Sequence, residues 1–141
     1  MKNIVVLSLL LLSTLFFKAT YAQSVQEMTT SSFKENIWNY DTNKEWKFAG
    51  NKPVIIDLYA SWCGPCKQLA PILDEIQKDM GDKIQIYKVN TEKEREIAQI
   101  FNVSSIPLMI FIPKEGQPFA VNGLRPKQQL MQIINEHLGV K

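Results

Sequence analysis

The hydrophobic positions of this chain fall into patterns that predict both strands and helices. Nearly continuous apolar runs at 54–59 and 108–112 are typical of strands buried on both faces of a sheet. Residues 83–89 alternate between apolar and polar side chains, which predicts another strand. Two longer stretches, 63–80 and 126–138, repeat apolar residues at helical spacing along one face. The chain is therefore expected to alternate strands with amphipathic helices.

Capping and turn residues predict several shorter elements. A Thr/Ser cluster precedes apolar residues at helical spacing, which indicates a short helix over 31–40. A capping box at 91–94 predicts the start of a further helix, with Asn102 as its left-handed terminator. Alternating aromatic residues predict a short edge strand over 46–48, whereas the polar residues 23–30 are expected to be a loose lead-in.

The order of these elements predicts the fold class. Strand, helix, strand and helix come first, and a turn at 114–116 then leads from the strand at 108–112 to one at 119–121. The sequence therefore predicts an α/β fold with a central mixed β-sheet that is flanked by helices on both faces.

The first 22 residues are expected to be a cleaved signal peptide. Lys2 provides a positive start, an apolar run extends from Ile4 to Phe17, and Thr20-Tyr21-Ala22 places small residues where a signal peptidase cleaves. The alternative is an uncleaved membrane anchor, but the run is shorter than the roughly 20 residues of a spanning helix. We therefore expect cleavage after Ala22 and export, with the bacterial periplasm as the destination.

Removal of this segment changes the charge of the protein. The formal net charge of +2 comes from Lys2 and Lys18, since residues 1–22 contain no acidic side chain. A mature chain of near-zero net charge argues against a nucleic acid or a membrane surface as partner. Residues 23–141 suit one compact domain and contain no further run that is apolar enough to cross a bilayer. No nucleotide-binding fingerprint is present, so no bound cofactor is expected.

The only two cysteines, Cys63 and Cys66, follow the apolar run 54–59 and open the predicted helix 63–80. A C-x-x-C at this junction indicates a redox dithiol, because the helix N-terminus stabilises a thiolate. The second thiol can then resolve a mixed disulfide formed by the first. A purely structural disulfide would close only a tiny loop and contribute little. A zinc site would need four ligands, and His137 is the only other soft candidate, so no metal is expected.

The residues around this motif resemble the thioredoxin family over roughly 52–139. They are the active-site signature Trp62-Cys63-Gly64-Pro65-Cys66-Lys67 and, in order, Asp57, Pro71, Lys88, Ile106-Pro107 and Gly123. The resemblance implies a thioredoxin-like domain over 23–141. It also implies that Cys63 is an exposed nucleophile with a lowered pKa and that Cys66 is the resolving thiol.

Asp57 lies in the middle of the apolar run 54–59 and six residues before Cys63. Burial should raise the pKa of a lone carboxyl at this position. The resemblance implies that such a carboxyl relays protons to and from Cys66, with Lys88 as the partner that tunes it. The alternative is a structural acid that Lys88 neutralises.

The resemblance also predicts where a substrate binds. Ile106-Pro107 matches the family's cis-proline loop, whose backbone pairs with an extended segment of substrate. Trp38 and Trp46 have no such context and are expected to be packing residues. The predicted substrate-binding residues are Trp62, Gly64, Pro65, Ile106, Pro107 and Gly123.

Three functions are compatible with these features. The first is reduction of protein disulfides, which the absence of a histidine between the two cysteines favours. The second is oxidation or isomerisation of exported proteins, and the third is a non-catalytic binding module. An exported reductase would need electrons from across the membrane, so the resemblance implies a membrane thiol-electron donor as partner. We expect the protein to be a monomer.

Overall fold

A computed structural model describes residues 23–140, so the predicted signal peptide at 1–22 lies outside the described residues. Five strands form one sheet in the order β1-β3-β2-β4-β5. Strands β1, β3 and β2 are parallel, whereas β4 is antiparallel to β2 and β5 is antiparallel to β4. The elements are β1 (Gln26–Glu27), α1 (Thr30–Asn36), β2 (Val54–Tyr59), α2 (Gly64–Met80), a 3-10 turn (Gly81–Lys83), β3 (Gln85–Asn90), α3 (Arg95–Ile100), β4 (Leu108–Ile112), β5 (Phe119–Asn122) and α4 (Lys127–His137).

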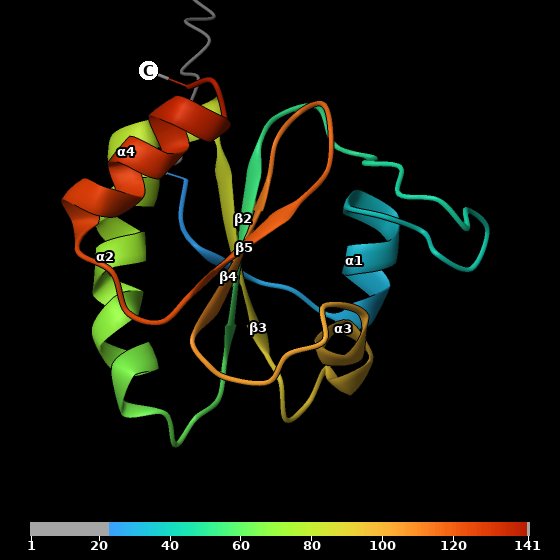
Figure 1. Ribbon diagram of the computed structural model, residues 1–141, viewed down its shortest axis with the longest axis horizontal. Helices are drawn as coiled ribbons and strands as arrows, with labels where there is room; N and C mark the ends of the chain where they lie inside the picture. Colours follow the sequence, from blue (N-terminus) through green and yellow to red (C-terminus); the bar gives the residue numbers. More distant parts are fainter. Residues whose placement is uncertain (1–22, 141) are drawn as a thin grey trace, which may run out of the picture.

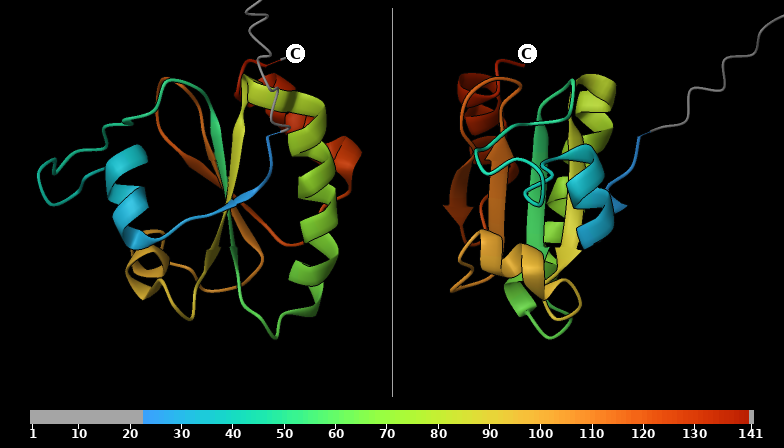
Figure 2. Two further views of the ribbon diagram at one scale, coloured as in Figure 1. Left: turned by 180° about the vertical axis from the view of Figure 1, so that it is seen from behind. Right: turned by 90° about the vertical axis from the view of Figure 1, so that its right-hand side faces the viewer.

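Helices cover both faces of the sheet, which confirms the predicted fold class. Helices α2 and α4 lie on one face and α1 and α3 on the other, as Figure 1 shows with the sheet seen nearly edge-on. The side view in Figure 2 (right) shows the main strands next to one another, with β2 at the centre. Strand β2 carries Asp57 and leads directly into the cysteine motif, so the central strand positions the site.

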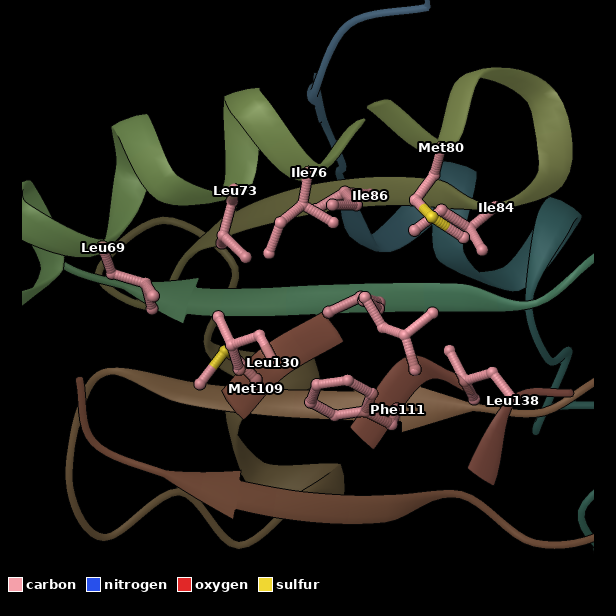
Figure 3. Close-up of a cluster of buried hydrophobic side chains, with 12 residues drawn as sticks. Leu69, Leu73, Ile76, Met80, Ile84, Ile86, Met109, Phe111, Leu130 and Leu138 are labelled. Carbon is pink, nitrogen blue, oxygen red and sulfur yellow. The ribbon is translucent and has the colours of Figure 1, made fainter. Parts of the chain in front are cut away.

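Each face of the sheet has its own buried core. Under α2 and α4, the side chains that α2 repeats at helical spacing meet β4 residues such as Phe111 (Figure 3). This agrees with the predicted amphipathic pattern of the two helices. Under α1 and α3, a second core contains Phe33, Ile37 and Ile97. Trp38 and Trp46 pack against it with ring centroids 5.4 Å apart, which agrees with their prediction as packing residues.

The N-terminal lead-in differs from the prediction, because it contains a strand. Gln26 and Glu27 form β1 and pair in parallel with Tyr87 and Lys88 of β3. Met28 follows and is buried in the core under α1. Both β1 residues are exposed polar side chains at the edge of the sheet, so no apolar periodicity marks this strand in the sequence.

Two other local predictions were wrong for reasons of tertiary contact. Residues 46–48 run as irregular chain, and the Trp46 and Phe48 side chains pack against the core under α1 and α3. Helix α3 begins at Arg95 rather than at the predicted capping box, because Thr91 is bound elsewhere. The backbone N–H and the side-chain hydroxyl of Thr91 both donate to the Tyr59 carbonyl, at 2.9 and 3.0 Å. Asn102 does adopt a left-handed conformation, with φ 48°.

Candidate active site

The two cysteines lie where β2 gives way to α2. Cys63 is the N-cap residue of α2, and its Sγ accepts a hydrogen bond from the Cys66 backbone N–H at 3.2 Å. The two residues form a disulfide with their Cα atoms 5.3 Å apart. In the reduced form, the same N–H and the positive end of the helix dipole would stabilise a Cys63 thiolate. The structure therefore contains the oxidised form of a dithiol whose first sulfur is set up as a nucleophile.

The exposure of this pair differs from the prediction for Cys63. Cys63 and Cys66 each expose only 4% of their surface, and they pack against Ala60, Tyr59 and Ile106. Their sulfurs are bonded to each other and covered by these neighbours, which explains why Cys63 is not exposed as expected. A protein substrate must therefore present its own disulfide at this surface to reach Cys63.

Trp62 is the exposed feature beside the disulfide. Its side chain is 70% exposed, the highest value for a large apolar residue in the described chain. Gly64 and Pro65, which follow Cys63, are also exposed. An exposed indole next to a reactive disulfide offers apolar area to a docking partner. These three residues lie on the surface, as their predicted role in substrate binding requires.

The proline loop meets the cysteine motif from β4. The Ile106–Pro107 peptide bond is cis, as predicted, and the Ile106 side chain packs against the disulfide cluster. The Gly123 N–H donates to the Pro107 carbonyl at 2.8 Å and fixes the loop to the end of β5. Gly123 has φ 79°, which an L side chain rarely adopts. The proline loop thus lies against the disulfide, and Gly123 is fixed to that loop.

Asp57 lies beneath the motif in an apolar environment. The residue is 3% exposed, and its Oδ1 atom has no hydrogen-bond partner within residues 23–140. Burial raises the pKa of the Asp57 carboxyl to about 7, although the nearby Lys88 ammonium acts to lower it. A cavity of about 190 Å³ is lined by both Asp57 and Cys66. A carboxyl that titrates near neutral pH therefore shares a space with the second cysteine.

Lys88 is placed beside Asp57 but has another ionic partner. Lys88 and Asp57 are register partners on β3 and β2. The Lys88 Nζ atom lies 3.5 Å from Oε1 of Glu27 on β1. The ion pair formed by Lys88 is thus with Glu27, which weakens the alternative of an Asp57 neutralised by a direct salt bridge. The predicted tuning of Asp57 by Lys88 rests on the electrostatic attraction between neighbouring strands.

Two contacts of the site could not be found from the sequence. Glu27 accepts a hydrogen bond from the Tyr59 hydroxyl at 2.9 Å, in addition to its contact with Lys88. Glu92 accepts from the Ser61 backbone N–H at 3.3 Å and from its hydroxyl at 2.9 Å, which fixes the loop before Trp62. Glu27 lies in a polar segment without a motif, and Glu92 lies in a capping box that predicts only a helix start, so only the folded chain places them at the site.

Comparison with known proteins agrees with this geometry. The thioredoxin family model matches residues 24–136. Thioredoxin from Borreliella burgdorferi is 39% identical over 112 residues, which are 79% of this chain and 96% of that protein. The thioredoxin structure from Malassezia sympodialis matches with a TM-score of 0.66 and 32% sequence identity. The match covers 82% of this chain and 92% of that chain. Chloroplastic thioredoxin z shares the fold, with a TM-score of 0.68 and 20% sequence identity. The match covers 82% of this chain and 96% of that chain.

A mixed sheet with helices on both faces and a disulfide at the start of α2 defines a dithiol–disulfide oxidoreductase. The chain belongs to the thioredoxin family, whose members act on protein disulfides. Within residues 23–140, no helix is long and apolar enough to cross a membrane.

Proposed function

We propose that this protein reduces protein disulfides through Cys63 and Cys66. The observation that carries the proposal is the shared cavity of Asp57 and Cys66 beneath the helix-capping Cys63. The Cys63 thiolate attacks a substrate disulfide, forms a mixed disulfide and releases one substrate thiolate. Asp57 then accepts the Cys66 proton, and the Cys66 thiolate attacks the Cys63 sulfur. The second substrate thiol leaves, and the enzyme is left with the Cys63–Cys66 disulfide.

The residues between the cysteines support reduction over oxidation. Gly64 and Pro65 carry no charge, whereas a histidinium at this place would stabilise the thiolate and therefore the reduced enzyme. A couple without that stabilisation should be closer to thioredoxin, at about −270 mV, than to strong oxidants, at about −120 mV. Equilibration with glutathione or a thioredoxin of known potential measures this value. A potential near that of the strong oxidants would support the oxidase or isomerase alternative instead.

Replacement of Cys66 by serine is expected to trap substrates. Cys63 can still attack a protein disulfide, but no second thiol can resolve the product, so mixed disulfides accumulate. Non-reducing gels and mass spectrometry of a variant incubated with a disulfide-containing protein would detect the adduct at Cys63. The double variant Cys63→Ser/Cys66→Ser is the matched control and should form none. Failure of Cys66→Ser to trap any protein would contradict direct action on protein disulfides.

Replacement of Trp62 by alanine is expected to weaken docking of protein substrates. The indole is 70% exposed, so the change removes contact area for a partner at little cost to folding. Truncation of an aromatic anchor at an interface typically costs about 2 kcal/mol, so KM for a protein disulfide should rise roughly thirtyfold. The rate with a small disulfide, which cannot reach across this surface, serves as the control. Equal losses with both substrates would show that Trp62 acts on the dithiol instead.

Export is proposed from residues 1–22, whose apolar run and Thr20-Tyr21-Ala22 end support cleavage after Ala22. In the bacterial periplasm, the reductase would act as a monomer and receive electrons from a membrane thiol-electron donor. N-terminal sequencing of the native protein tests the cleavage, and a chain that starts at Met1 would contradict it. Sedimentation of the mature protein tests the monomer.

A further inference from the structure

A row of charged residues crosses the sheet next to the active site. Glu27 of β1 is the register partner of Lys88 on β3, and Lys88 is the register partner of Asp57 on β2. Register partners on neighbouring strands point to the same face of a sheet. The row continues with Met109 and Val121, which belong to the core beneath α2 and α4. Lys88 therefore lies between two carboxyl groups, one buried and one exposed.

The exposed carboxylate is fixed by a second contact. Oε1 of Glu27 accepts from the Tyr59 hydroxyl at 2.9 Å and lies 3.5 Å from Lys88 Nζ. Tyr59 is two residues after Asp57 on β2, so its side chain points to the same face. Tyr59 and Lys88 both line the cavity that contains Asp57 and Cys66. The Glu27 contacts thus hold two walls of that cavity in place.

We propose that Glu27 is a positioning residue of the proton relay: its carboxylate, fixed by the Tyr59 hydroxyl, holds the Lys88 ammonium and keeps it from pairing with Asp57. This inference rests on the proposed function of Asp57 as the group that exchanges a proton with Cys66. The cost of an uncompensated buried carboxylate then raises the pKa of Asp57 towards neutrality, so that its carboxylate is basic enough to take the Cys66 proton. If Lys88 paired with Asp57, the pKa of the carboxyl would fall well below neutrality, and its carboxylate would be too weak a base to take the Cys66 proton efficiently.

The charged groups around Asp57 determine the direction in which loss of the Glu27 charge shifts its titration. Lys88 on β3 and Lys67 on α2 line the cavity and attract a negative Asp57, whereas Glu27 on β1 opposes them. On β4, the neighbour is the uncharged Met109. Burial and the hydrogen bond to Glu27 raise the pKa of the Tyr59 hydroxyl to about 12, so it remains a donor. Removal of the Glu27 charge should therefore lower the pH at which Asp57 titrates.

The test measures the NMR chemical shift of the Asp57 carboxyl carbon as a function of pH, in protein with labelled aspartate. The oxidised form is used because its cysteines do not titrate. In Glu27→Gln, we expect the midpoint to fall by roughly half a pH unit, the size of one partly screened charge. Glu35→Gln on α1, an equally conservative change at an exposed residue, should leave it unchanged. An unchanged or higher midpoint in Glu27→Gln would overturn the proposal.

A second variant tests the route through Lys88. In a Lys88→Met background, Glu27→Gln should move the midpoint by less than half as much, because the ammonium that Glu27 holds is gone. An undiminished shift there would overturn the proposed route. The function of Asp57 is tested separately by the rate at which Asp57→Asn resolves a mixed disulfide. An unchanged rate would refute the relay itself while leaving the Glu27 titration result intact.

Discussion

Replacement of Cys63 by serine should reduce the rate of protein-disulfide reduction at least about a thousandfold, because a hydroxyl cannot act as the attacking thiolate. Cys63 caps α2, and its Sγ accepts the Cys66 N–H. A serine oxygen can accept the same hydrogen bond, so the helix should be retained. The measurement is turnover of a disulfide-containing protein with a chemical dithiol as the electron source.

The control for this prediction is the reduced wild-type protein, whose circular dichroism spectrum the serine variant should match. The prediction also fixes the order of the two thiols. In Cys63→Ser, the remaining Cys66 should react with a small alkylating agent much more slowly than Cys63 does in Cys66→Ser. If Cys66 proved to be the faster thiol, the roles assigned to the two cysteines would be reversed.

Replacement of Asp57 by asparagine should change how the stability of the protein depends on pH. The pKa of this carboxyl is raised from 3.8 to about 7 in the folded chain. Between these values, the folded state holds a proton that the unfolded state has lost, so stability falls as the pH rises. The penalty is absent below about pH 4 and is complete above about pH 7, where it reaches about 4 kcal/mol. Asparagine carries no such penalty at any pH.

Urea unfolding of the oxidised wild-type protein and of Asp57→Asn at pH 4 and pH 8 measures this effect. The stability of the variant relative to wild type should increase by about 4 kcal/mol between these two values. Any fixed cost of burying the amide cancels in this comparison. The change Asp74→Asn on the exposed face of α2 is the matched control and should give a constant difference. A constant difference for Asp57→Asn as well would show that the carboxyl is not held protonated.

The elements that the sequence predicted well are those with strong local signals. The apolar runs of β2 and β4 were predicted at their observed bounds, because strands buried on both faces need continuous apolar residues. Helix α2 was predicted from its periodicity to within one residue. By contrast, β1 is two exposed polar residues, and only its pairing with β3 makes it a strand.

The elements that were wrong have local signals that tertiary contacts override. The aromatic alternation at 46–48 fits a strand, but the Trp46 Nε1–H donates to the Gly116 carbonyl at 3.1 Å and the rings pack into a cluster. Thr91 fits a helix cap, but its hydroxyl is bound to the end of β2. In both cases the partner lies at least about thirty residues away in sequence, beyond the range of any local pattern.

The site shows the same division between sequence and tertiary structure. The sequence by itself determined the dithiol at a strand–helix junction, the acid within a buried strand and the proline loop, because each carries its chemistry in adjacent residues. Only the tertiary structure decided that Cys63 is covered in the disulfide form and that Lys88 pairs with Glu27. The cover over Cys63 depends on neighbours that include Ile106 of the distant proline loop. The Lys88–Glu27 pair depends on the register of β1 and β3, which joins residues about sixty positions apart.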